Sequence, residues 1–188
     1  MNRLPQILLI AAFLPFCWLA MQAVHELGHV VGAVATGGRV ERVVLHPLTI
    51  SRTDLSPNPC PLVVVWAGPA VGMVLPLGLL VAARVGRWKW AHLVQFFAGF
   101  CLIANGAYLG IGSFGRIGDA GDLLRHGSPI WSLWLFGAAS FPFGLYLWNG
   151  LGPQFGLGAA GKVDHRAAYV CCGLLILTVA LEVALSSW

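Results

Sequence analysis

The motif His25-Glu26-Leu27-Gly28-His29 carries the strongest chemical signal in the sequence. Side chains at positions i and i+4 of a helix lie on one face, so both imidazoles can bind the same metal ion. Zn²⁺ is commonly bound by two histidines at this spacing, and the glutamate between them then lies beside the open coordination position. There it can accept a proton from water whose pKa the zinc lowers to about 7. We therefore predict one Zn²⁺ per chain, bound by His25 and His29, with Glu26 as the general base.

A catalytic zinc site usually has three protein ligands, and the acidic residues supply the candidates for the third. Asp119 and Asp122 come directly after the third long apolar segment. A carboxylate oxygen is an ordinary zinc ligand, but an acid in the first turn of a helix also offsets the helix dipole. The residues alone leave the choice between the two open. The other acids lie in predicted loops or near the end of an apolar segment: Glu41, Asp54, Asp164 and Glu182.

The composition places this motif in a membrane. Of the 188 residues, 58% are hydrophobic and only 10% are charged, whereas an ordinary soluble domain has about 25% charged residues. So few charges cannot cover a water-exposed surface, so we expect a lipid bilayer to surround the chain. The formal net charge is +4, but its lysines and arginines are scattered singly. We therefore expect no nucleic-acid partner.

Five apolar segments are long enough to cross a bilayer as helices, namely residues 4–36, 61–85, 90–111, 130–148 and 167–185. We expect an all-α polytopic membrane protein that forms a single integral-membrane domain over residues 1–188. The first segment exceeds the length that one span requires, and Pro15 is where we expect it to bend. Its basic start is similar to a signal peptide, but no small-x-small cleavage site precedes His25, so we expect it to be retained.

The sequence between the first two apolar segments predicts a short β-hairpin over residues 37–52. β-Branched residues dominate it, Gly37 and Gly38 begin it, and Pro47 separates two strand-like halves. Such a hairpin is either an ordinary interfacial loop or an edge strand that binds an extended peptide through backbone hydrogen bonds.

The order of three motifs resembles the site-2 protease family of intramembrane zinc metallopeptidases. The HExxH at His25–His29 is followed by Ala67-Gly68-Pro69, which resembles the family's Gly-Pro motif, and then by Ile117-Gly118-Asp119 at a later helix start. The run from Asp119 to Leu124 lies over the family's Asp-Gly-Gly-x-Leu-Leu pattern. The resemblance therefore implies Asp119 as the third zinc ligand, with Asp122 as the second choice.

The resemblance also implies an activity and a location. It is to the compact, divergent bacterial branch of the family, which implies a multi-pass protein of the bacterial inner membrane that hydrolyses membrane-protein or peptide substrates. The chain departs from the family where substrate is handled. The usual Asn-Pro before the aspartate is missing, and Asn105 lies fourteen positions upstream of Asp119.

We expect three residues to contact the substrate, namely Gly68, Pro69 and Asn105. Gly68 and Pro69 either break the second span beside a water-lined cleft or simply kink it.

Two other functions fit the same residues. One is a metal-binding membrane protein without hydrolysis, such as a sensor, an assembly factor or a transporter subunit. The other is a proton or ion relay that uses the buried histidines and Glu26 without stoichiometric zinc. Glu26 favours hydrolysis over the first alternative, because a purely structural metal site needs no general base.

Overall fold

Long apolar helices form most of the protein, which the computed structural model describes over residues 3–158 and 163–186. The helices are α1 (Leu4–Ala35), α2 (Pro61–Val85), α3 (Ala91–Gly115), α4 (Gly118–Arg125), α5 (Ile130–Trp148) and α6 (His165–Ser186), with a short 3₁₀ helix, η1 (Gly152–Phe155). Within the described residues, α1, α2, α3, α5 and α6 are the five helices long and apolar enough to cross a membrane. The predicted polytopic all-α fold is confirmed.

The helix boundaries lie within two residues of the predicted segments except at the end of α3. α1 continues through Pro15 as one helix, so the expected bend does not end or interrupt it. α3 continues to Gly115 rather than residue 111, and the amide of Arg116 still donates to the carbonyl of Gly112. α3 stops at Arg116, which has a left-handed backbone with φ of +51°. This early reversal leads directly into α4.

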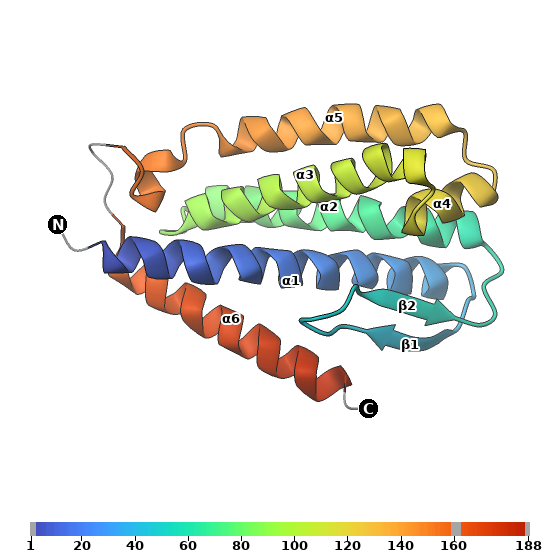
Figure 1. Cartoon of the computed structure of the whole chain (residues 1–188), viewed down its shortest axis with the longest axis horizontal. Coiled ribbons are helices and arrows are strands. Elements are labelled where there is room, and N and C mark those ends of the chain that lie inside the picture. The colour runs from blue at the N-terminus through green and yellow to red at the C-terminus, as the bar shows by residue number, and fades with distance from the viewer. Residues whose placement is uncertain (1–2, 159–162, 187–188) are drawn as a thin grey trace.

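α2 and α3 lie between α1 and α5, and α6 lies on the other side of α1 (Figure 1). α5 packs along α3, and α6 packs against α1 near its own N-terminal end and then diverges from it. A core of aromatic and aliphatic side chains joins the first half of α1 to α3, α6 and η1. Phe13 lies at its centre, with its ring centroid 5.5 Å from that of Phe96 and 6.2 Å from that of Phe155.

The predicted β-hairpin lies beside the second half of α1 (Figure 1). Its strands, β1 (Val40–Val44) and β2 (Arg52–Leu55), pair antiparallel with Val43 opposite Thr53. β2 begins only at the residue where the predicted hairpin ended. The intervening residues turn instead of extending, because the amide of Thr49 donates a hydrogen bond to the carbonyl of His46.

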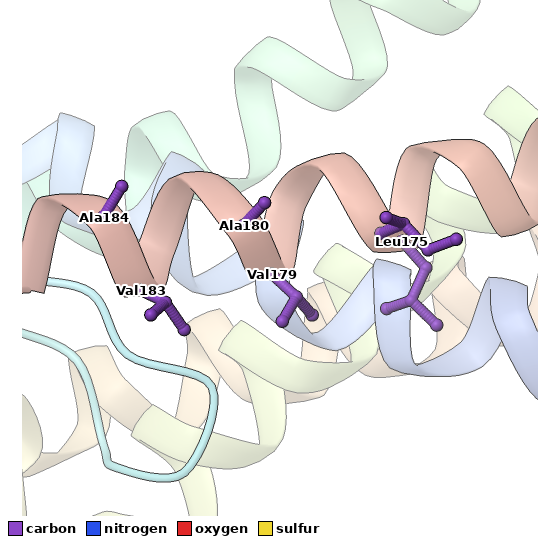
Figure 2. A pocket seen from close by; sticks show the side chains of 6 residues that line it. Leu175, Val179, Ala180, Val183 and Ala184 are labelled. Atoms are coloured by element: carbon purple, nitrogen blue, oxygen red, sulfur yellow. The ribbon is translucent and has the colours of Figure 1, made fainter.

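Figure 2 shows apolar side chains along the diverging end of α6. A shallow hollow of about 670 Å³ runs along it, lined by Leu175, Ile176, Val179, Ala180, Val183 and Ala184. None of these side chains can bind a metal ion or transfer a proton. The histidines predicted to bind a metal ion lie elsewhere, in the second half of α1.

Candidate metal centre

His25, His29 and Asp119 converge at one point, and their candidate ligand atoms all lie within 4.8 Å of one another. The two histidines are one turn apart on α1 and are only 7% exposed. The Oδ2 atom of Asp119 lies 2.7 Å from Nε2 of His25 and 3.2 Å from Nε2 of His29. Two imidazole nitrogens and one carboxylate oxygen are a normal donor set for a catalytic Zn²⁺. The residues thus fit the metal that the motif predicts.

Hydrogen bonds behind the two histidines fix which nitrogen faces the site. Nδ1–H of His25 donates to Oδ1 of Asn105 at 2.7 Å, and Nδ1–H of His29 donates to the carbonyl oxygen of Val64 at 2.9 Å. Asn105 is itself held, because its amide nitrogen donates to the carbonyl of Cys101 at 2.9 Å. Because each Nδ1 donates away from the site, Nε2 is the nitrogen of both imidazoles that faces Asp119 and is positioned to bind a metal ion.

Glycines let α1 and α2 approach closely enough for this arrangement. A Cβ on Gly28 would lie 2.3 Å from the carbonyl oxygen of Ala67. A Cβ on Gly68 would lie 2.4 Å from Cε1 of His29 and 2.9 Å from Nε2 of His25. The absence of a side chain at Gly68 therefore lets both imidazoles pack directly against the backbone of α2. α2 continues as one helix through Pro69, which is buried, so of the two alternatives for this motif, a break or a kink, the break does not occur.

Asp119 reaches the histidines because α3 and α4 meet in a tight reversal. After Arg116, Gly118 also has a positive φ of +51°, and Asp119 then lies in the first turn of α4. The amide of Asp119 donates to the hydroxyl of Tyr108 at 3.1 Å, which fixes the start of the helix.

Asp122 lines the same cavity but lies apart from the three convergent ligand atoms. It pairs with Arg125 at 2.5 Å, and its side chain is 42% exposed. It does not belong to the convergent group.

The carboxyl of Asp119 is ionised across the ordinary pH range. Burial alone raises its pKa, but hydrogen bonds with His25 and His29 outweigh that effect and hold the pKa well below its usual value. An ionised carboxylate is the form that binds a metal ion.

Glu26 faces the hairpin on the other side of the site. It is 3% exposed, and its Oε2 accepts a hydrogen bond of 2.6 Å from the hydroxyl of Thr53 in β2. One turn earlier on α1, Oε1 of Gln22 accepts a hydrogen bond of 3.1 Å from the amide of Ser51. Sequence reasoning did not find these hairpin contacts. Gln22 carried a usable signal, because it is a polar residue four positions before Glu26 in an otherwise apolar helix.

A cavity of about 1020 Å³ opens onto the site between α1, α3, α4 and β2. His25, Glu26, His29 and Asp119 all line it. Of the residues predicted to contact substrate, Asn105 lines the cavity, whereas Gly68 and Pro69 pack between helices. A cavity of this size has room for several residues of extended peptide.

The Peptidase M50B-like family model matches residues 6–108, which is more than half of the 188 residues. The matched range contains His25, Glu26 and His29, whereas Asp119 lies beyond it. No curated protein and no solved structure matches the chain significantly.

Proposed function

The chain belongs to the Peptidase M50B-like family, within the site-2 protease family of membrane proteases, and from this premise we propose that it is a zinc-dependent intramembrane endopeptidase. The observation that carries the proposal is the convergence of both Nε2 atoms and the Asp119 carboxylate beside a buried glutamate. We also propose that it acts in the bacterial inner membrane, because its motifs resemble the compact bacterial branch.

The chain's own side chains supply most of the proposed mechanism. His25, His29 and Asp119 would hold Zn²⁺, which when bound polarises the scissile carbonyl and lowers the pKa of water. Glu26 accepts the proton of the attacking water on its carboxylate and passes it to the leaving amine. The low exposure of Glu26 keeps bulk water from competing for that proton.

The substrate must present an extended backbone, because the carbonyls of a helix are shielded by its own hydrogen bonds. β2 lines the same cavity as the metal ligands, so we propose that an unwound substrate segment adds to the hairpin as a further strand. Backbone hydrogen bonds to an edge strand bind peptides with little sequence selectivity. Asn105 acts behind His25 in this proposal rather than on the substrate itself.

Metal analysis tests the proposed ligands. We expect about one zinc per chain in the detergent-purified wild type and in Asp122→Ala, and loss of zinc in His29→Ala and Asp119→Ala. Thermal unfolding of each variant without added metal checks that it folds. A folded wild type that binds no transition metal would overturn the proposal in favour of an ion relay.

Cleavage tests the proposed base. The probe is a library of internally quenched peptides added to the zinc-loaded protein in lipid nanodiscs. Glu26→Gln keeps the size of the side chain and a hydrogen-bond acceptor but cannot take the proton, so we expect zinc to stay bound while cleavage is lost. Equal cleavage by wild type and Glu26→Gln, or none by either, would favour a metal-binding protein without hydrolysis.

A further inference from the structure

The only side chain that hydrogen-bonds to Glu26 within the described residues comes from outside the helices. It is Thr53 of β2, whose hydroxyl donates to Oε2 of Glu26 at 2.6 Å. This distance is typical of a charge-assisted O–H···O⁻ bond, which is stronger than a bond between neutral groups. A partly exposed hairpin thus holds a buried carboxylate that lines the same cavity as the metal ligands.

A second hydrogen bond shows that the hairpin packs along α1 at more than one residue. Gln22 and Glu26 are four residues apart on α1, and they accept from Ser51 and Thr53, which are two residues apart. Four residues of helix rise about 6 Å, and two residues of strand rise about 6.6 Å, so the two spacings match. β2 also runs in the same direction as α1 (Figure 1). The end of the hairpin is therefore aligned along the helix face that carries the base.

From this geometry we propose that Thr53 is a positioning residue for Glu26 and that it couples the hairpin to the proposed hydrolysis. Thr53 holds Oε2, which leaves Oε1 to accept the proton of the attacking water. A substrate strand that adds to the hairpin then binds the same element that orients the base. The inference rests on the proposed function, because Glu26 must act as the base.

The chain offers a matched set of variants for the kinetic test. Thr53→Val removes the hydroxyl while keeping the shape and the preference for strand, and Thr53→Ser keeps the hydroxyl. Thr49→Val makes the same exchange at an exposed position in the turn of the hairpin, so it is the control. We expect Thr53→Val to lower kcat about tenfold, with KM and zinc content unchanged. Thr53→Ser and Thr49→Val should stay within about twofold of wild type.

Hydrogen exchange gives a readout that does not depend on activity. In the zinc-loaded protein we expect backbone amides of residues 51–55 to exchange several-fold faster in Thr53→Val and Glu26→Ala than in wild type. Glu26→Gln keeps an acceptor for the hydroxyl but loses the charge, so its exchange should lie between those of wild type and Glu26→Ala. The exchange of Thr53→Ser should match wild type. Equal protection in all five proteins would overturn the proposed coupling.

The two measurements separate this inference from the proposed function. If the wild type shows no zinc-dependent cleavage, the proposed function fails and the role of Thr53 fails with it. If the wild type cleaves and Thr53→Val retains the full kcat, only the role of Thr53 is overturned. A fall in kcat that Thr53→Ser restores, together with faster exchange in Thr53→Val, supports the inference.

Discussion

The two halves of α1 pack in opposite ways although they form one continuous helix. The first half uses large side chains, and Phe13 is 3% exposed among aromatic rings from α3 and η1. The second half uses almost none, because Gly28 meets the backbone of α2 directly. Close helix approach brings the two histidines against α2, but it leaves little apolar side-chain area to bury. Stability therefore comes mainly from the first half and chemistry from the second.

The two halves of α1 should therefore respond differently to substitution. Substitutions in the first half should lower the free energy of unfolding and leave zinc affinity unchanged. Substitutions around the second half should do the reverse. Distant sites without shared partners usually behave independently, and one continuous helix is a demanding test of that independence.

The largest expected effect is on stability, from Phe13→Ala. Removing a buried phenylalanine costs about 3–5 kcal/mol through lost burial and the cavity left behind. Leu14→Ala is the control, because Leu14 is the next residue of α1 and is 42% exposed. Denaturant unfolding in detergent should show a large loss for Phe13→Ala and a small one for Leu14→Ala. Zinc per folded chain should match wild type in both, and loss of zinc from folded Phe13→Ala would break the division.

Gly68→Ala should have the next largest effect, and on zinc rather than on unfolding. Its new Cβ would lie 2.4 Å from the ring of His29, so the imidazole or the helix must shift. Displacing a ligand in this way should weaken zinc binding about a hundredfold, or about 2.7 kcal/mol. Gly78→Ala is the control on the same helix, because a Cβ there meets nothing within 4 Å. Competition with a chromophoric chelator measures the zinc affinity of both variants. Unchanged affinity in Gly68→Ala would show that the imidazoles do not require a glycine at this position.

Gly68 also shows what the sequence could and could not predict. The helices and the motif histidines were predictable, because hydrophobic length and i, i+4 spacing are local properties. Gly68 was expected to break α2 or contact substrate, yet it supports His29 from within an intact helix. Its function depends on how closely α1 and α2 approach, and no local pattern encodes that distance.

The same reason explains the residues that lie behind the site. Asn105 was expected to contact substrate, and the structure places it on Nδ1 of His25. Thr53 gave no signal at all, because a threonine in a strand is ordinary. Only the docking of the hairpin onto α1 brings it to Glu26. Asp119 was chosen over Asp122 from the family resemblance, and the structure brings only Asp119 to the histidines.

Asn105 supports the metal centre from a third helix, α3, and gives the third prediction. Asn105→Leu removes the acceptor for Nδ1–H of His25, so the imidazole loses its fixed orientation. Zinc affinity should fall about 10- to 100-fold, as for other residues that orient metal ligands. Asn105→Asp keeps an acceptor and should retain most of the affinity. If both variants bind zinc equally well, the hydrogen bond of 2.7 Å does not orient the ligand.

The smallest expected effect concerns Asp164, which lies directly before α6 begins. Asp164 lies 2.8 Å from Nζ of Lys89 and accepts hydrogen bonds from the indole of Trp90 and the amide of Arg166. These partners, Lys89 first, hold the pKa of Asp164 below its usual range. A carboxyl with a depressed pKa stabilises the folded state above its unfolded pKa, and that stabilisation disappears as the pH falls through the folded pKa.

Asp164→Asn should therefore lower the Tm slightly at neutral pH, because exposed ion pairs contribute little. The difference from wild type should shrink once the pH falls below about 3.9, the usual pKa of an aspartate. Zinc affinity at neutral pH should not change, because this contact joins α6 to the loop before α3 and touches no residue of the site. Thermal unfolding across a pH series measures the first effect and chelator competition the second. A difference in Tm that persists unchanged at low pH would mean that Asp164 acts through its hydrogen bonds rather than its charge.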